Sequence, residues 1–181
     1  MTGPRLVIVT GAMAAGKSTV AEALARRLPK SVHLRGDLFR RMIVNGAAPM
    51  GPVLSDEAAA QLALRHRLAC DAARRYHEAG FAVVYQDILI GASLADVAER
   101  LADLEPLVVV LTAAPGVLAA RDRARAKTGY GEGFPPTVLA DALERDTPRV
   151  GLWLETSAMS VDAVVDAILA AMARGHGAGG A

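Results

Sequence analysis

A glycine-bounded loop stands between an apolar run and a helix-forming segment near the start of the sequence. Residues 11–18 read GAMAAGKS and match the pattern GxxxxGK[ST]. The preceding run Leu6–Thr10 predicts a buried strand, and the spacing of the following apolar residues predicts a helix from about Gly16 to Leu28. Because strand, loop and helix follow in this order, the segment is predicted to be a P-loop that binds the phosphates of a nucleoside triphosphate.

The residue types of this loop suit the chemistry of phosphate binding. Glycines at both ends let the backbone fold into a nest of inward-pointing N–H groups, and the following helix adds the positive end of its dipole. Lys17 supplies a mobile charge for the β and γ phosphates, and Ser18 is predicted to hold Mg²⁺. The predicted nucleotide-binding residues are Gly11, Ala12, Ala14, Ala15, Gly16, Lys17, Ser18 and Thr19.

Four more short apolar runs predict further strands. They are Val32–Leu34, Ala82–Gln86, Leu107–Leu111 and Val150–Leu154. Aromatic residues make up only 4% of the chain, so aliphatic side chains must fill the core, as is typical of helices packed against a parallel sheet. Strands that alternate with helices predict an α/β fold with helices on both faces of a parallel sheet and ligands beyond the carboxyl ends of the strands.

Capping residues and apolar spacing locate the remaining helices. They are predicted at Ser55–Gly80, Ser93–Leu104, Pro115–Lys127 and Ser160–Ala173. The buried face of the longest helix is predicted to carry Ala60, Leu64, Leu68 and Ala72. Two segments dense in glycine and proline, 45–54 and 128–136, are predicted loops. Residues 1–174 are predicted to form one domain, and 175–181 a flexible tail.

Charge and cysteine content exclude several classes of protein. The net charge of +1 gives no broad basic surface, so no nucleic-acid partner is expected. The single cysteine, Cys70, can form neither an internal disulfide nor a cysteine-based metal cluster. The first apolar run is too short for a signal peptide or a membrane span. A soluble, cytoplasmic protein with no membrane partner is therefore predicted.

Acidic residues follow two of the predicted strands. Asp37 lies in the segment HLRGDL of residues 33–38, and Asp87 follows Ala82–Gln86. A carboxylate beside the phosphates can orient a hydroxyl nucleophile and take its proton. The alternative for Asp37 is that it caps a helix beginning at Leu38. Asp87 is predicted to order Mg²⁺ through water or to touch the acceptor, the alternative being an ordinary residue at a strand end.

Basic and reactive residues elsewhere give weaker indications. Arg121 and Arg125 are four residues apart and share a helix face, as do Arg123 and Lys127, so one pair can face the site and the other the solvent. The alternative is a solvated basic helix. Two positions are possible for a further set of arginines: near the acceptor or on the ordinary surface. The set is Arg40, Arg41, Arg65 and Arg67. Three histidines show no metal-ligand spacing, and the single cysteine has no neighbour that would lower the pKa of its thiol. We interpret all four as structural: His33, His66, His77 and Cys70.

Signature motifs narrow the class of P-loop protein. The guanine-reading Asn-Lys-x-Asp of small GTPases and the Leu-Ser-Gly-Gly of ABC proteins are absent, and the chain is too short for an AAA+ module with an added helical domain. With the P-loop and the Gly-Asp element, the chain resembles the P-loop kinases of small molecules, such as gluconate, shikimate and adenylylsulfate kinases. The chloramphenicol phosphotransferase-like group is most similar, through Gly51-Pro52, the strand ending near Asp87, Gly91 and the Arg-x-x-x-Arg helix.

This resemblance implies a function and roles for particular residues. It implies a P-loop NTPase fold with strand order 2-3-1-4-5, and transfer of the γ-phosphoryl group of ATP, with Mg²⁺, to a hydroxyl of a small molecule such as an antibiotic or a metabolite. Asp37 would be the base, and Lys17, Arg121 and Arg125 would complete the catalytic set, the arginines lying on a lid. Thr156 and Ser157 would lie near adenine by analogy. A nucleotide or nucleoside kinase and an ATP-binding regulatory module without an acceptor remain the alternatives.

Overall fold

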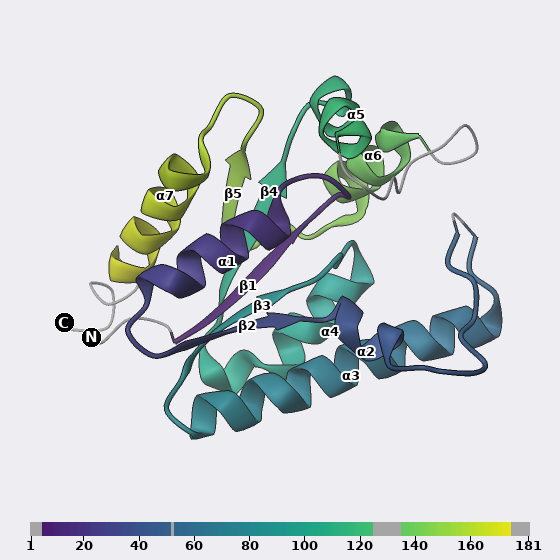
Figure 1. Ribbon diagram of the computed structural model, residues 1–181, viewed down its shortest axis with the longest axis horizontal. Helices are drawn as coiled ribbons and strands as arrows, with labels where there is room; N and C mark the ends of the chain where they lie inside the picture. Colours follow the sequence, from purple (N-terminus) through teal and green to yellow (C-terminus); the bar gives the residue numbers. More distant parts are fainter. Residues whose placement is uncertain (1–4, 52, 125–134, 175–181) are drawn as a thin grey trace.

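A parallel sheet of five strands forms the centre of the molecule (Figure 1), and its strand order is β2-β3-β1-β4-β5. The computed structural model describes residues 5–51, 53–124 and 135–174. The strands are β1 (Leu6–Gly11), β2 (Ser31–Arg35), β3 (Ala82–Gln86), β4 (Leu107–Thr112) and β5 (Leu152–Glu155). The predicted sheet and its strand order are confirmed.

Helices cover both faces of this sheet. They are α1 (Lys17–Arg27), α2 (Asp37–Arg41), α3 (Asp56–Glu78), α4 (Ala92–Arg100), the 3₁₀ turn η1 (Ala102–Leu104), α5 (Pro115–Arg123), α6 (Pro136–Asp146) and α7 (Val161–Arg174). On one face α1 and α7 pack against Val7 and Val9 of β1, and on the other α3 and α4 pack against Leu6 and Ile8 (Figure 1). Because side chains alternate along a strand, an apolar β1 can supply both cores, which makes the fold three-layered as predicted.

Several helix ends follow their sequence signals. The hydroxyl of Ser55 accepts a hydrogen bond of 3.2 Å from the backbone N–H of Ala58 and so caps α3. Gly80, with φ +81°, takes the left-handed conformation just beyond the end of that helix. Pro115 is the first residue of α5, and Ser160 caps α7 by accepting from Ala163 at 3.2 Å. Among the described helices, none is both long enough and apolar enough to cross a membrane.

Four predicted boundaries are wrong, the first being the end of α5, which falls at Arg123 rather than near Lys127. α4 begins at Ala92, with Gly91 at the N-cap and no side-chain cap, so Ser93 and Asp96 form no capping box. The same helix, α4, ends at Arg100, before the separate turn η1, and does not continue to Leu104. β5 begins at Leu152 rather than Val150 because Gly151 bends the chain, with φ +71°, directly against β4, where a Cβ would lie 2.2 Å from the carbonyl oxygen of Val108.

Helix α6 was not predicted. The pair Pro135-Pro136 was interpreted as the end of a loop, but Pro136 is the first residue of the helix. Proline is favoured at that position because its missing N–H would have no partner within the helix. Leu143 of α6 is 1% exposed, so the helix contributes to the core.

The predicted buried face of α3 is also wrong. Leu64 and Leu68 are 43% and 39% exposed, whereas His66 is 7% exposed. The residues that α3 buries are Ala58, His66, Ala69, Cys70 and Ala73. The helix is therefore rotated so that polar residues of its middle turns face the rest of the protein while two leucines face outward.

Candidate active site

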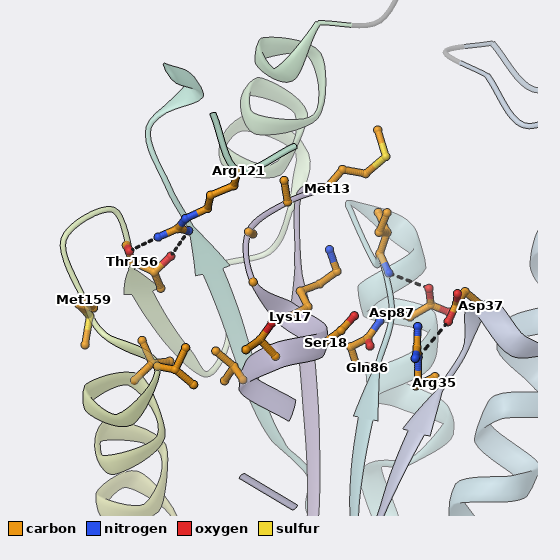
Figure 2. Close-up of a pocket in the computed structure, with 18 of the residues that line it drawn as sticks. Met13, Lys17, Ser18, Arg35, Asp37, Gln86, Asp87, Arg121, Thr156 and Met159 are labelled. Carbon is orange, nitrogen blue, oxygen red and sulfur yellow. Dashed lines mark hydrogen bonds and ion pairs between the residues drawn. The ribbon is translucent and has the colours of Figure 1, made fainter. Parts of the chain in front are cut away.

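A cavity of about 640 Å³ opens at the carboxyl edge of the sheet. The P-loop and the start of α1 line its middle, between two groups of side chains on either side (Figure 2). One group, beyond β4 and β5, comprises Arg121, Thr156, Met159, Val161 and Val164. The other, beyond β2 and β3, comprises Arg35, Asp37, Arg41, Arg65, Gln86, Asp87 and Ile88. We call the first group the β5 end and the second the β2 end.

The P-loop has the backbone conformation that a phosphate nest requires. Gly11 and Gly16 have φ values of 147° and 89°, and Ala14 has φ 60°. A side chain at Gly11 would also collide with the neighbouring strand, since its Cβ would lie 2.3 Å from the carbonyl oxygen of Leu111. The amino group of Lys17 lies inside the loop, where it donates a 2.7 Å hydrogen bond to the carbonyl of Ala12. The predicted loop is thus formed, with glycine where only glycine fits.

Most of the predicted nucleotide-binding residues line the cavity. These are Ala14, Ala15, Gly16, Lys17, Ser18 and Thr19. Gly11 and Ala12 do not line it, because they are buried at the base of the loop. Ser18 is the second residue of α1, so its hydroxyl lies at the positive end of the helix beside the phosphate nest (Figure 2).

Asp37 lies at the β2 end, held between two arginines. Its Oδ2 forms an ion pair of 2.7 Å with Arg41, one turn along α2, and its Oδ1 lies 3.6 Å from Nε of Arg35 at the end of β2 (Figure 2). Gly36 occupies the N-cap of α2, and no side-chain cap is formed there. The alternative that Asp37 caps this helix is therefore wrong. The carboxylate faces the cavity instead.

Asp87 is buried and paired with Arg65 of α3. Nε of Arg65 donates to its Oδ2 at 2.9 Å, and the second guanidinium nitrogen donates to Oδ1. The backbone N–H of Ile88 donates to Oδ1 at 2.7 Å, and the hydroxyl of Tyr85 donates to Oδ2 at 3.4 Å. The Asp87 side chain is 1% exposed and that of Arg65 13% exposed. Burial lowers the pKa of Arg65 and raises that of Tyr85, since both lose the stabilisation that water gives their charged forms.

Gly36 makes room for this buried pair. A Cβ on Gly36 would lie 2.0 Å from Oδ2 of Asp87, although the backbone angles of Gly36, φ −61° and ψ −31°, suit any residue. Its N–H also donates to the carbonyl of Gln86 at 3.0 Å, which ties the end of β2 to the end of β3. The glycine of the Gly-Asp element is thus needed for space rather than for backbone freedom.

Of the four arginines left open by the sequence, the structure brings two to the cavity. Arg41 and Arg65 line it. Arg40 turns away and donates to the carbonyl of Ala48 at 2.7 Å, and Arg67 is exposed on α3. Nothing in the apolar pattern of α3 distinguishes Arg65 from Arg67. The signal that could have done so is the strand-end carboxylate of Asp87, which requires a positive partner when buried.

The β5 end combines an arginine with an apolar wall. Arg121 donates to the carbonyl of Thr156 at 2.7 Å and to its hydroxyl at 3.3 Å, so its guanidinium lies beside the loop after β5 (Figure 2). Met159, Val161 and Val164 add apolar surface. Ser157 does not line the cavity; its hydroxyl accepts from the N–H of Ala114 at 2.9 Å. A planar cation beside an apolar wall suits a nucleobase.

Other predicted residues lie away from the site or outside the described part of the chain. Arg125, the loop at 128–134 and the tail at 175–181 lie outside the described residues. Burial raises the pKa of the Cys70 thiol to about 11, which suits a core residue rather than a nucleophile. Burial, with the charge of Arg65 nearby, lowers the pKa of His66 to about 4.

The sheet, the P-loop and the position of the cavity together define a P-loop NTPase fold of the kinase type. The sequence matches the family described as an AAA domain over residues 6–148, and the chain belongs to that family. The matched region contains β1 to β4 and α1 to α6; the described residues beyond it contain β5 and α7, which complete the sheet and its helical cover. A comparison with curated proteins finds none that matches the sequence.

Solved structures of two kinases and of a resistance protein share this fold. A gluconokinase from Sinorhizobium meliloti 1021 is 22% identical, with 96% of this chain and 94% of that chain covered and a TM-score of 0.65. The APS kinase CysC of Mycobacterium tuberculosis, in complex with AMPPNP and APS, is 19% identical, with 94% and 99% covered and a TM-score of 0.65. The tunicamycin resistance protein of Deinococcus radiodurans is 18% identical, with 91% and 93% covered and a TM-score of 0.65. At these identities the likeness shows the fold alone.

Proposed function

We propose that the protein transfers the γ-phosphoryl group of ATP to a hydroxyl of a small molecule. The observation that carries the proposal is a single cavity in which a formed P-loop lies between a β5 end with an arginine and an apolar wall and a β2 end lined by Asp37. A site that only binds a nucleotide would need the P-loop and the β5 end but not the β2 end. The kinases that share the fold, among them a gluconokinase and an APS kinase, support the same reaction class.

The residues of the chain divide the work of this reaction. The P-loop N–H groups and Lys17 bind the phosphates and stabilise the charge that develops on the transferred group. Asp37 orients the acceptor hydroxyl and takes its proton as the oxygen attacks the γ phosphorus, while the bond to the bridging oxygen breaks and ADP leaves. Arg121 binds the nucleotide at the β5 end, and Arg125 is proposed to reach the phosphates when the lid closes.

The residues present fit a nucleotide-bound Mg²⁺. When bound, Mg²⁺-ATP supplies the phosphoryl group with part of its charge neutralised. Ser18 has the hydroxyl at the position that P-loops use for this ion. The described residues contain no group of three or more His, Cys, Asp or Glu side chains that could hold a metal by themselves. Ser18, the phosphates and water would therefore provide the ligands, with Asp87 limited to the outer role proposed from the sequence.

The alternative functions make different demands on the β2 end. An ATP-binding regulatory module without an acceptor predicts a closed or flat surface there, whereas the cavity continues to Asp37. A nucleotide or nucleoside kinase is kept open by Arg41 and Arg65 at this end. A specific relation to chloramphenicol phosphotransferases, and a role in antibiotic resistance, remain proposals, with the tunicamycin resistance protein as a structural relative. Use of ATP agrees with the cytoplasmic location predicted from the sequence.

A mass-resolved acceptor screen tests the proposed function. The protein is incubated with Mg²⁺-ATP and hydroxylated metabolites, nucleosides and antibiotics, and products are sought that gain one phosphoryl group. We expect transfer by the wild-type chain and none by Lys17→Ala, which also binds ATP more weakly because it removes the positive side chain within the nest. Near-normal transfer by Lys17→Ala would contradict the P-loop assignment. ATP binding without transfer to any acceptor would favour the regulatory module.

A further inference from the structure

The β2 end of the cavity carries more positive than negative charge. Three guanidinium groups line it, those of Arg35, Arg41 and Arg65, against the carboxylates of Asp37 and Asp87. Arg65 and Asp87 neutralise each other in a buried pair. Asp37 therefore shares its single negative charge between Arg35 and Arg41, which leaves one positive charge in excess among the described residues here.

The carboxylate of Asp37 reaches the cavity with its side chain 30% exposed, but both of its oxygens face arginines. Its Oδ1 is buried without a hydrogen-bond partner, and Nε of Arg35, 3.6 Å away, is likewise buried without one. Its Oδ2 is occupied by Arg41 at 2.7 Å. An acceptor hydroxyl therefore competes with Arg35 for Oδ1 and with Arg41 for Oδ2, so at least one arginine must shift for either oxygen to be fully available. Both can do so, since the Arg35 and Arg41 side chains are 39% and 65% exposed.

The chemistry of the acceptor decides whether this exchange is favourable. A neutral acceptor would exchange an ion pair of Asp37 for a hydroxyl and leave the released arginine to solvent, whereas an anionic group can take over the arginines that Asp37 releases. Arg65 is not available for this, because both oxygens of the buried Asp87 depend on it. The exchange therefore concerns only Arg35 and Arg41.

We propose that the acceptor is a hydroxylated anion whose negative group, a carboxylate or a phosphate, binds Arg35 and Arg41 and so frees Asp37 for the reacting hydroxyl. This inference rests on the proposed phosphotransferase function and names the acceptor class within it. It makes Arg35 and Arg41 specificity-determining residues, in addition to the catalytic Asp37.

Anion binding can be measured without any phosphoryl transfer. The P-loop is first filled with Mg²⁺ and AMPPNP, and inorganic sulfate is then titrated calorimetrically into the wild-type protein and into Arg35→Gln, Arg41→Gln and Arg67→Gln variants. We expect sulfate to bind the wild-type chain and the Arg67→Gln control alike. Binding should weaken at least about tenfold in each of the other two variants, as expected when a charged hydrogen bond is lost. No sulfate binding, or binding unchanged in both pocket variants, would overturn the inference.

The acceptor screen gives a second readout, the preference for charged over neutral acceptors. Its library then needs matched pairs: a hydroxylated carboxylate with its neutral amide, or a sugar phosphate with its free sugar. Anionic members should have the higher kcat/KM, and Arg41→Gln should reduce that preference while Arg67→Gln leaves it intact. Equal phosphoryl transfer to the neutral member of each pair would overturn the inference but would leave the proposed kinase function supported. The opposite result is sulfate binding that depends on Arg35 and Arg41 in a protein that phosphorylates no acceptor in the screen. It would support the anion site and contradict the proposed phosphotransferase function.

Discussion

Both oxygens of the Asp87 carboxylate accept hydrogen bonds from the guanidinium of Arg65, in a pair that is almost entirely removed from solvent. The pair joins the end of β3 to the middle of α3, across the floor of the β2 end. Removing one member of such a pair leaves the other as an uncompensated buried charge, which is far more costly than removing both.

Asp87→Asn is accordingly expected to lower the free energy of unfolding by about 3 to 5 kcal/mol. The double variant Arg65→Met/Asp87→Leu should recover most of that stability, because it buries no unpaired charge. Denaturant unfolding of the single and double variants measures both. If Asp87 serves Mg²⁺ instead, Asp87→Asn should raise the Mg²⁺ concentration needed for transfer with little change in stability.

Gly36→Ala should destabilise the protein by about 1 to 3 kcal/mol, the usual cost of overpacking. The added methyl group would occupy the position of Oδ2 of Asp87. Gly116→Ala is the matched control, since a Cβ there has no heavy atom within 4 Å and the residue lies in α5. Thermal unfolding should leave that control unchanged or slightly more stable. Equal stability of the two variants would contradict the steric role of Gly36.

Asp37→Asn should lower kcat roughly 100-fold or more while ATP affinity stays nearly the same, because the substitution removes a base and keeps the shape. Stability should change by no more than about 1 kcal/mol, since the carboxylate caps no helix and its ion pairs with Arg35 and Arg41 are partly exposed. Steady-state kinetics and calorimetric ATP titration separate the two effects. Unchanged kcat would remove Asp37 from the catalytic role and make Asp87 the next residue to test.

His66 is expected to make stability depend on pH. Its pKa is lowered from 6.5 to about 4 in the folded chain, so the unfolded chain binds the extra proton between these values. The free energy of unfolding should be fully maintained above pH 6.5 and fall by about 3 kcal/mol as the pH approaches 4. His66→Leu should flatten this decline, whereas His77→Leu, at a more exposed position, should affect it less. Equal pH slopes in the wild-type chain and His66→Leu would contradict the assignment.

Arg121 and Arg125, which the resemblance places on a lid, are expected to act on different steps. Arg125→Ala should lower kcat more than it raises the KM for ATP, because its guanidinium is proposed to stabilise the transferred group. Arg121→Ala should chiefly raise that KM, since Arg121 lies beside Thr156 at the β5 end. Arg123→Ala, exposed on the same helix, is the control. Two results together would contradict this role: wild-type turnover in Arg125→Ala, and hydrogen exchange in the segment 128–136 that AMPPNP and acceptor leave unchanged. The arginines would then belong to a solvated basic helix.

The nucleotide half of the site was predictable because its geometry is local. The spacing of Gly11, Gly16 and Lys17 within one loop specifies the nest, and the strand before it places the loop at the edge of the sheet. Asp37 could be placed for a similar reason, since only Gly36 separates it from the end of β2. No long-range contact had to be known for either.

The β2 end, the proposed acceptor half, depends on contacts that the sequence does not display. The apolar repeat of α3 suggested that Leu64 and Leu68 face the core, but the helix turns Arg65 and His66 inward because Asp87 requires a buried cation. The energy of that pair is invisible to apolar periodicity. Helix α6 was missed for a different reason, because adjacent prolines signal both a loop and the start of a helix.

The central place of β1 in the sheet has a consequence for how such enzymes diverge. Every residue of the β2 end comes from residues 35–88, whereas the β5 end is built from residues beyond 120, on the other side of the P-loop. Substitutions at the proposed acceptor site can thus be confined to one contiguous block of the gene, apart from the residues that build the β5 end. A chimaera that receives residues 31–91 of another kinase with this strand order should take over its acceptor and keep its own nucleotide.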